Sequence, residues 1–277
     1  MSTGKIATDG GTAKPAVPGY DDVVDRNEVT LLMTPGDLAV VNGDLALTRR
    51  GDLMMTSPEY HAFFRLVNWW RFNFPVLSVM FDSVFPSVDD ATRLDQALEE
   101  QFAIAAKKSP HPMTSLDYDA YHRINDERGA IEVVRGVYAG AIVVAVSNAP
   151  QSFRADIEGV QHEWDTAVPR FAGCSFGQVV VASANNVRHG DEWQTARPPT
   201  ARQLQSMRVL STVLNEPLDP ADGSRHRFGR EVSPEVLQAV CGGNVARLEE
   251  NFFAFAKDLL LRREQRNLSQ TKENAGK

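Results

Sequence analysis

Short apolar runs alternate with glycine-containing turns between residues 36 and 56, and this pattern predicts a small antiparallel meander. Two of the runs flank Asn42-Gly43, a dipeptide that supplies the positive φ angles of a tight type I′ hairpin turn. Gly-Asp-Leu starts at residues 36, 43 and 51, each time where an apolar run begins. We therefore expect three short strands near the N-terminus.

An aromatic helix is expected after the meander. Ser57 can cap it, Pro58 suits its first position, and Glu59 places a negative charge in its first turn. Apolar side chains recur at steps of three and four residues and make one stripe: Tyr60, Phe63, Phe64, Val67, Trp70 and Phe74. Because Pro75 disfavours continuation, we expect the helix to end between residues 71 and 73.

Trp69 and Phe72 fall outside this stripe, which leaves two interpretations open. The helix is either a thick core helix that is buried on more than one side, or part of an interface with another protein. Trp and Arg are enriched at the energetically important positions of protein interfaces. The candidate interface residues on this helix are Arg65, Trp69, Trp70, Arg71 and Phe72.

The next part of the chain is expected to be helical. Residues 76–85 are apolar and are expected to pack beneath the aromatic helix, and a helix is expected from residue 87 or 89 to about residue 107. Ser-Pro-His-Pro at 109–112 breaks the chain. Residues 118–128 are expected to form one more short helix.

Residues 131–147 are rich in β-branched side chains. A buried strand at 140–146 explains this composition, and a buried helix containing glycine is the alternative. A second short strand is expected at 177–183, with a helix at 153–167 between the two. We expect these strands to form a second small sheet.

Three helices are expected towards the C-terminus. Thr200 is a suitable cap for a helix to Leu214, residues 215–229 form a loop, and Ser233-Pro234-Glu235 repeats the helix start seen at Ser57. The helix after Ser233 is expected to break at Gly242-Gly243. The last helix carries a seam of apolar residues with coiled-coil-like spacing, Val245, Leu248, Phe252, Phe255 and Leu259.

The seam packs either on the protein's own body or on a partner helix, and the sequence leaves both open. The expected fold class is α+β, with a small N-terminal antiparallel meander, a second short sheet and several amphipathic helices including a C-terminal one. We divide the chain into an extended N-terminal arm (1–27), a meander and aromatic-helix region (28–130), a second α/β region (131–266) and a polar tail (267–277). Because the arm cannot form a hydrophobic core, we expect it to lie along another subunit.

Composition and charge narrow the range of partners. The net charge of −7 argues against a general nucleic-acid binder, because such binding comes from neutralising phosphates. The N-terminus lacks the basic start and apolar stretch of a secretory signal. The longest apolar run that we identify, Val137–Val146, is about half of the roughly 20 residues that span a bilayer. We therefore expect no nucleic acid and no membrane among the partners, and a cytoplasmic site of synthesis.

Candidate chemistry is sparse. The chain contains no P-loop, no Gly-x-Gly-x-x-Gly, no Gly-x-Ser-x-Gly and no His-Glu-x-x-His. Cys174 lies among small residues, so it could act as a nucleophile with His162 or His189, or it could be a buried, inert cysteine. The histidines lack the spacing of a compact metal site, and we expect neither metal nor cofactor.

The stretch Gly36-Asp37-Leu38-Ala39-Val40-Val41-Asn42-Gly43-Asp44-Leu45-Ala46-Leu47 resembles the opening of small baseplate wedge proteins from contractile-tailed, Mu-like phages. In that family a similar hairpin precedes an amphipathic helix with an Arg-Leu pair, and Arg65-Leu66 has the matching position here. The resemblance covers about 40 of the 277 residues. It implies a virion structural subunit of a tail or baseplate, without catalysis, that assembles with other subunits as a homo- or hetero-oligomer in the bacterial cytoplasm.

Two other functions remain as alternatives at this point. One is an intracellular cysteine-dependent hydrolase that uses Cys174 with His162 or His189 and needs a thiol of lowered pKa. The other is a non-catalytic intracellular regulator that binds another protein through the Val245–Leu259 seam. The regulator requires a free apolar helix face.

Overall fold

The computed structural model describes residues 15–33, 35–48, 50–85, 88–193, 199–218 and 231–275. The structure is mostly helical and contains two small antiparallel sheets of two strands each, so the predicted α+β class is confirmed. The helices are α1 (Tyr20–Arg26), α2 (Pro58–Val84), α3 (Val88–Lys108), α4 (Tyr118–Asp156), α5 (Gln161–Thr166), α6 (Phe176–Trp193), α7 (Ala201–Leu214), α8 (Ser233–Cys241) and α9 (Val245–Ala275). The strands are β1 (Val40–Val41), β2 (Asp44–Leu45), β3 (Arg170–Phe171) and β4 (Cys174–Ser175), and short 3-10 turns cover Thr30–Met33 and Pro112–Ser115.

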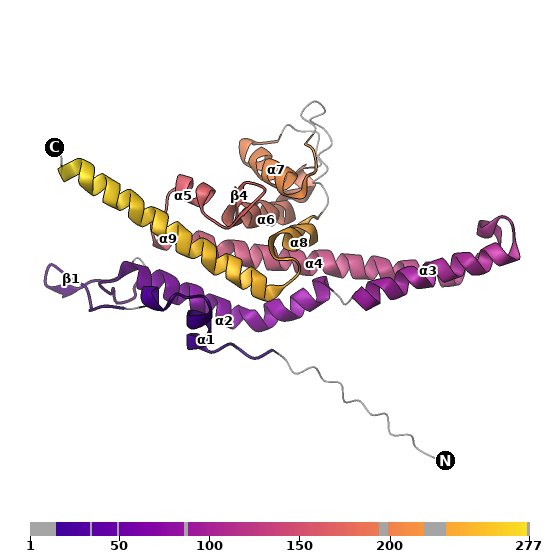
Figure 1. The fold of residues 1–277 in the computed structure, drawn as a ribbon, viewed down its shortest axis with the longest axis horizontal. Helices are drawn as coiled ribbons and strands as arrows, with labels where there is room; N and C mark the ends of the chain where they lie inside the picture. The colour runs from indigo at the N-terminus through magenta and orange to yellow at the C-terminus, as the bar shows by residue number, and fades with distance from the viewer. Residues whose placement is uncertain are drawn as a thin grey trace, which may run out of the picture.

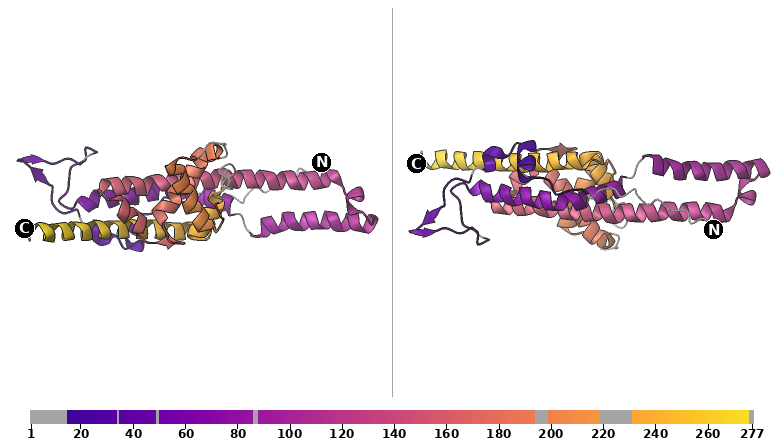
Figure 2. Two further views of the ribbon diagram at one scale, coloured as in Figure 1. Left: turned by 90° about the horizontal axis from the view of Figure 1, so that it is seen from above. Right: turned by 90° about the horizontal axis from the view of Figure 1, so that it is seen from below.

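Three long helices, α2, α4 and α9, run lengthwise through the body (Figures 1 and 2). The shorter helices α5 to α8 cover one side of this layer, and α1 packs on the other side against α2. The two ends of the molecule differ. The meander stands at the end where α2 begins, and a two-helix arm projects from the opposite end.

The two-helix arm, which is separate from the N-terminal arm, consists of α3 and the first half of α4, which run antiparallel (Figure 1). Leu94 and Ala105 of α3 are buried, as is Ala120 of α4. Arg93 and Glu127 form an ion pair of 3.0 Å across the two helices. The residues predicted as a short helix at 118–128 are therefore the first turns of a 39-residue helix.

The meander agrees with its prediction. Asn42 and Gly43 have φ angles of 54° and 87°, as a type I′ turn requires, and β1 pairs antiparallel with β2. A third segment adds to the hairpin through antiparallel bridges that join Leu38 to Met55 and Leu47 to Leu53.

The aromatic helix begins as predicted, but its predicted end is wrong. α2 starts at Pro58 and continues through Pro75 to Val84, so residues 76–85 extend the same helix and do not pack beneath it. A proline inside a helix removes one hydrogen bond and usually kinks or ends the helix. Trp70 and Leu77 are buried on either side of Pro75, and this tertiary packing holds the helix together across it.

The predicted positions of the second sheet are wrong, because residues 140–146 lie in α4 and residues 177–183 lie in α6; for 140–146 the alternative, a buried helix containing glycine, is the observed one. The buried residues of α4 recur with helical spacing: Ala139, Ile142, Val143, Val146, Ala149 and Phe153. A helix that packs on several neighbours can carry apolar, β-branched residues at successive positions. Its sequence then resembles that of a buried strand. The real second sheet is the small hairpin of β3 and β4, which the sequence did not reveal.

Gly177 explains how closely α6 approaches its neighbours. A Cβ atom at this position would lie 2.5 Å from Trp164 Cζ2 and 2.6 Å from Phe255 Cζ. Only glycine leaves room for both rings, so this residue fixes the packing of α6 against α5 and α9.

Several element boundaries need smaller corrections. The helix expected at 153–167 is split, because α4 ends at Asp156 and α5 begins at Gln161. Gly242, with a φ angle of 61°, ends α8, so the break expected at the glycine pair is confirmed. The polar tail expected at 267–277 is helical as far as Ala275. The predicted cap at Thr200 is confirmed, because its side chain accepts a hydrogen bond from the Gln203 N–H.

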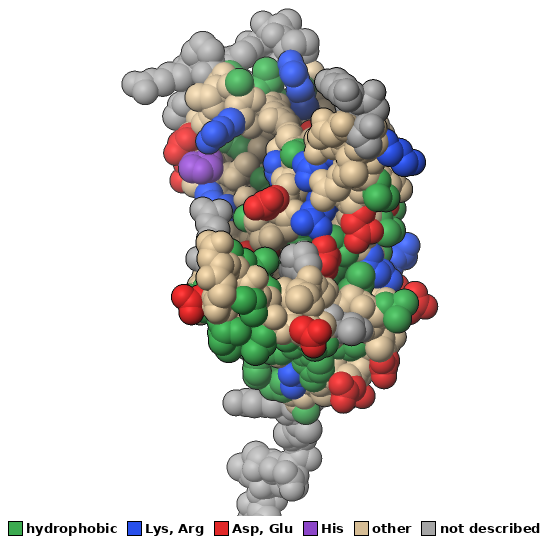
Figure 3. Space-filling model, turned by 90° about the vertical axis from the view of Figure 1, so that its left-hand side faces the viewer, with side chains coloured by type: hydrophobic (Ala, Val, Ile, Leu, Met, Phe, Trp, Pro, Cys, Tyr) green, Lys and Arg blue, Asp and Glu red, His purple; other side chains and the backbone are tan. Residues whose placement is uncertain are grey.

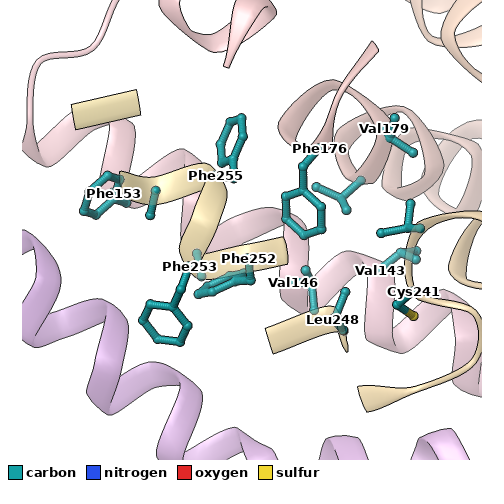
Figure 4. Close-up of a cluster of buried hydrophobic side chains, with 14 of the residues drawn as sticks. Val143, Val146, Phe153, Phe176, Val179, Cys241, Leu248, Phe252, Phe253 and Phe255 are labelled. Atoms are coloured by element: carbon teal, nitrogen blue, oxygen red, sulfur yellow. The ribbon is translucent and has the colours of Figure 1, made fainter. Parts of the chain in front are cut away.

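The hydrophobic core lies where α2, α4, α6, α8 and α9 meet (Figure 4). Phe252, Phe253 and Phe255 point in different directions from a single turn of α9, and all three are buried. Phe253 faces the α2 side, whereas Phe255 and Phe176 lie near each other, with ring centroids 5.8 Å apart. α9 therefore contributes a row of aromatic side chains to the core and contacts α2, α4, α5, α6 and α8.

The N-terminal arm was predicted to lie away from its own core, and for residues 20–27 this is wrong. α1 buries Val23 and Val24 in the core, and Arg26 pairs with the buried Glu249 of α9. Residues 1–14 of the predicted arm lie outside the described residues. The boundary expected between residues 130 and 131 falls inside α4, so no break in the fold separates the two predicted regions there.

Candidate protein-binding surfaces

The meander exposes its apolar side chains on both faces. Val40, Val41 and Leu45 are each more than half exposed, although successive residues of a strand point to opposite faces. The flanking residues Leu38, Leu47 and Leu53 are exposed as well. Neither face of the meander is covered by the protein's own core, and both are open to another molecule.

A view from the meander end shows where apolar surface gathers. Hydrophobic side chains are concentrated in the lower half of this face, whereas most Lys and Arg side chains lie in the upper half and along the right edge (Figure 3). The lower half corresponds to the side on which Figure 1 places the meander and α2.

A second apolar surface covers neighbouring stretches of α2 and α4. We call it the α2–α4 face and define it by seven exposed residues with helical spacing: Phe72, Val76 and Val79 of α2, and Val134, Val137, Ala141 and Asn148 of α4. Phe72 is 65% exposed and Val137 is 63% exposed. These values are high for large apolar side chains that share one surface, and such patches mark sites of interaction.

Two contacts show that α2 and α4 run antiparallel along the whole face. At one end, Arg65 Nε donates a hydrogen bond of 3.0 Å to Asp156 Oδ2. At the other end, the Arg135 guanidinium lies 6.0 Å from the centroid of the Phe85 ring. Residue numbers therefore rise along α2 as they fall along the facing part of α4. This places Phe72 beside Asn148 and Val79 beside Ala141.

A pocket of about 460 Å³ lies at the Arg65 end of the face. Phe64, Trp69 and Phe72 line it from α2, and Asn148 and Ser152 line it from α4. The pocket shows that exposed residues of the two helices share one side of the molecule at this end. The helical spacing of the other exposed residues extends the α2–α4 face along both helices.

Charged residues close this end of the face. Asp156 is mostly buried and lies between two arginines, 3.0 Å from Arg65 Nε and 3.2 Å from Arg50 Nε. Arg65 Nη1 also lies 3.2 Å from Asp52. Because Arg50 and Asp52 belong to the meander, these ion pairs tie the meander to α2 and α4.

The predicted interface residues of the aromatic helix have different surroundings. Trp70 is fully buried against Phe252, so it is a core residue, and Trp69 is half-buried and stacks on the same ring at 5.5 Å. Arg71 Nε donates to the Pro18 carbonyl oxygen at 2.9 Å. Of the five predicted residues, Phe72 presents the largest apolar surface to solvent.

The C-terminal seam is turned inward. Leu248, Phe252, Phe255 and Leu259 are at most 1% exposed, and Val245 packs at the edge of the core. The seam therefore binds the protein's own body, and the interpretation as a free interface is wrong. A regulator that acts through this seam has no face with which to bind.

Cys174 does not have the surroundings of a nucleophile. Burial raises the pKa of its thiol, although the nearby Arg170 lowers it in part, and a reactive cysteine needs a lowered pKa. His189 lies 13 residues beyond the start of α6, which is about 20 Å along the helix axis. His162 is exposed on α5, and among the described residues no hydrogen bond joins Cys174 to a histidine. Cys241 is buried in the core, and its pKa is raised to about 11, chiefly by burial.

Within the described ranges, no group of three or more His, Cys, Asp or Glu residues is arranged to hold a metal ion. His61 accepts a hydrogen bond from the Met55 N–H through Nε2, so it fixes the end of the meander on α2.

By length and composition, α4 is the one helix in the described part of the chain that could cross a membrane. Its uncharged stretch runs from Gly136 to Phe153 and is longer than the run that we identified in the sequence. Only 28% of the most apolar window of α4 is buried within one copy of the chain. Its inner side nevertheless packs on α2, α6 and α8 as a core helix does.

Comparison of the chain with family models, with curated proteins and with solved structures finds no match. The assignment of function therefore depends on the surfaces described above and on the resemblance of residues 36–47 to phage baseplate proteins.

The residues that matter most on the α2–α4 face were expected to be buried. Val76 and Val79 belong to the apolar run that we expected to pack beneath the aromatic helix, and Val137 belongs to the run that we interpreted as part of a strand region. The signal that could have revealed them is their spacing, since residues 72, 76 and 79 and residues 134, 137 and 141 each follow a helical period.

Proposed function

We propose that this protein is a structural subunit of a protein assembly and binds a second copy of itself through the α2–α4 face. In line with the resemblance of residues 36–47, we further propose that the assembly is the tail or baseplate of a contractile-tailed phage. The observation that carries the first proposal is the face itself, a two-helix surface on which Phe72, Val76, Val79, Val134 and Val137 are exposed in one copy of the chain.

The size of the face suits a dimer. The stretch of α2 from Arg65 to Ser83, which includes the face and both of its ends, spans about 18 residue steps, or about 27 Å. Two packed helices are about 20 Å wide, since their axes lie 8–10 Å apart and each is about 10 Å across. The resulting footprint of about 500 Å², enlarged by side-chain relief and the aromatic pocket, approaches the roughly 800 Å² per partner of a stable interface.

The charges at its ends favour a second copy as the occupant. Asp82, which is exposed, lies at the edge of the face where α2 ends, and the half-exposed Arg50 lies at the opposite end beside Arg65. In a two-fold dimer with antiparallel α2 helices, Asp82 of each copy approaches Arg50 of the other. An isologous interface requires this kind of self-complementarity.

The symmetry also specifies what lies at the centre. Arg50 lies beside Arg65, and the midpoint of positions 65 and 82 falls between residues 73 and 74, so the two-fold axis passes close to Phe72 and brings it near its own counterpart. The meander, which exposes apolar side chains on both faces, remains free for further subunits in such a dimer.

Light scattering after size-exclusion chromatography tests the dimer. We expect a mass of twice 30.6 kDa for the native chain and of 30.6 kDa for Phe72→Asp. A dimer of this variant would bury the two introduced carboxylates next to each other. Leu261→Asp is the matched control, since Leu261 is about as exposed as Phe72 but lies on α9. A native chain that is monomeric at tens of micromolar, or that floats with lipid vesicles instead, would contradict the proposed dimer.

Mass spectrometry of purified virions tests the narrower proposal of a phage tail subunit. The chain is expected at a fixed copy number relative to other tail proteins. Its absence from the particles, together with turnover of a substrate by the isolated protein, would contradict a structural role in the virion.

A further inference from the structure

We infer that a pocket between the end of α6 and the start of α7 binds a phosphate group. The pocket has a volume of about 350 Å³, and its walls include His189, Glu192 and Trp193 of α6 and Arg202 and Gln203 of α7. It lies apart from the α2–α4 face and does not depend on the proposed assembly function. Three side chains that line the pocket, Trp193, Arg202 and His189, and the N-terminal turn of α7 supply the groups that could bind an anion there.

Trp193 supplies the first observation. Its side chain is 2% exposed and lines the pocket, and its indole Nε1 has no hydrogen-bond partner within the described part of the chain. Buried N–H groups in folded proteins are almost always paired, because an unpaired donor has lost its water without compensation. An acceptor bound in the pocket would satisfy this donor.

The second observation is the N-terminus of α7, a helix of 14 residues. Its capping box uses the N–H groups of Thr200 and Gln203, which pair with the side chains of Gln203 and Thr200 respectively. The N–H groups of Ala201 and Arg202 lie in the first turn, where a helix offers no acceptor of its own. Such N–H groups and the positive end of the helix dipole together favour a bound anion.

Arg202 is the third feature, and its position is unusual for a cation. Acidic side chains are favoured in the first turn of a helix, and a positive charge there is repelled by the dipole. Arg202 nevertheless occupies the second helical position and lines the pocket. A bound phosphate would reverse the sign of this interaction, because the anion attracts both the guanidinium and the helix terminus.

His189 is held by a chain of hydrogen bonds that begins at the cap of α7. Gln203 Oε1 accepts from the Thr200 N–H at 2.8 Å, and this directs Gln203 Nε2 to Glu192 Oε2 at 3.1 Å. Glu192 Oε1 lies 3.1 Å from His189 Nδ1. With its Nδ1 proton donated to Glu192, the ring can also donate to an anion from Nε2 when it is in the imidazolium form, in which both nitrogens carry a proton.

Glu192 is the one carboxylate in this set, and it opposes an anion. Its two oxygens are engaged by His189 and Gln203, which reduces that opposition. Trp193, Arg202 and the first turn of α7 supply donors, and a tetrahedral phosphate offers several acceptor oxygens to meet them. The pocket volume lies at the lower end of the range of about 300–1,000 Å³ for small-molecule sites, so it suits a phosphate ion or a small phosphorylated molecule.

Titration with inorganic phosphate, followed through the indole N–H signals of the four tryptophans in a ¹H–¹⁵N spectrum, tests the inference. We expect the Trp193 signal, assigned by its loss in Trp193→Phe, to shift with saturation, while the signals of the other tryptophans stay in place. Arg202→Ala is expected to weaken binding at least tenfold, and Arg202→Lys is expected to retain part of it. Arg208→Ala, on an exposed position of the same helix, serves as the matched control and should bind as the native chain does.

Trp193→Phe gives a second readout, because it removes the N–H group and keeps an aromatic ring in the core. The variant is expected to fold with a melting temperature close to the native value. Phosphate is expected to raise the melting temperature of the native chain, and we expect the variant to lose most of this increase. Tighter binding of ribose 5-phosphate than of inorganic phosphate would identify a phosphorylated small molecule as the ligand. Equal binding of the two would identify the phosphate ion. Both results would support the site. The absence of a Trp193 shift at 20 mM phosphate, or equal binding by native chain and Arg202→Ala, would overturn the inference.

Discussion

The guanidinium of Arg26 lies 2.8 Å from Oε1 of Glu249, although 223 positions separate the two residues in the chain. The same oxygen accepts a hydrogen bond of 2.8 Å from Asn27 Nδ2. Glu249 is buried near the start of α9, so these contacts attach α1 to α9.

Glu249→Ala is therefore expected to destabilise the protein. The substitution leaves the buried Asn27 amide without one acceptor and removes a charge-assisted bond, and we expect a loss of about 1–3 kcal/mol in the free energy of unfolding. Urea denaturation measures it. Glu250→Ala, at the exposed neighbouring position, should change stability by less than about 0.5 kcal/mol. Equal effects of the two substitutions would show that the Arg26–Glu249 contact does not hold α1.

Deletion of residues 2–25 is expected to lower the melting temperature substantially. The deletion removes Val23 and Val24 from the core, and each fully buried valine contributes roughly 1.5–3 kcal/mol through its burial. Differential scanning calorimetry of the truncated and full-length chains checks this. An unchanged melting temperature would mean that α1 belongs to another subunit, as its composition first indicated.

Gly177→Ala is expected to destabilise the protein by about 1–3 kcal/mol, because the added methyl group would overlap Trp164 and Phe255. Gly190→Ala provides a control on the same helix. The nearest atom to a Cβ at Gly190 is Asn186 Nδ2 at 3.8 Å, so this substitution should be neutral or stabilise α6 by up to about 1 kcal/mol. Thermal unfolding of both variants measures the contrast, and a stable Gly177→Ala protein would refute the close packing.

Tyr20 is expected to make stability fall at high pH. Burial, with smaller contributions from Tyr60 and Asp21, raises the pKa of Tyr20 to about 12 from its ordinary value of 10.0, and Arg71 offsets this only in part. Below pH 10 the phenol is protonated in both states. Between pH 10 and 12 the unfolded chain releases this proton and the folded chain keeps it, so the free energy of unfolding decreases as the pH rises. In urea titrations at pH 8 and pH 11, Tyr20→Phe should lose less stability than the native chain; an equal loss would contradict this role for Tyr20.

The sequence predicted the features that depend on local chemistry. Asn42-Gly43 indicated the hairpin turn because the dipeptide tolerates positive φ angles. Thr200 indicated the start of α7 because its hydroxyl caps the helix. Pro75 and the run at 140–146 misled the prediction, because tertiary packing decided both. A helix held on either side by Trp70 and Leu77 continues through proline, and an apolar run that contacts several helices resembles a strand.

The candidate surfaces were predicted only in part. Phe72 could be recognised because it falls outside the apolar stripe of its helix. Val76 and Val79 could not, since the predicted end of α2 placed them in a different element. The pocket at α7 depends on the approach of Gln203 to Glu192 from another helix, which no spacing along the chain reveals.

Disulfide cross-linking through a single cysteine introduced by Phe72→Cys tests the proposed dimer most directly. In a Cys174→Ser background, with Cys241 buried in the core, a two-fold axis near residue 73 brings the introduced thiol of one copy next to that of the other. The Phe72→Cys chain is expected to form a covalent dimer of twice 30.6 kDa under mild oxidation at low micromolar concentration, while Leu261→Cys in the same background stays monomeric. A Phe72→Cys chain that stays monomeric, or that cross-links no faster than Leu261→Cys, would contradict assembly through the α2–α4 face.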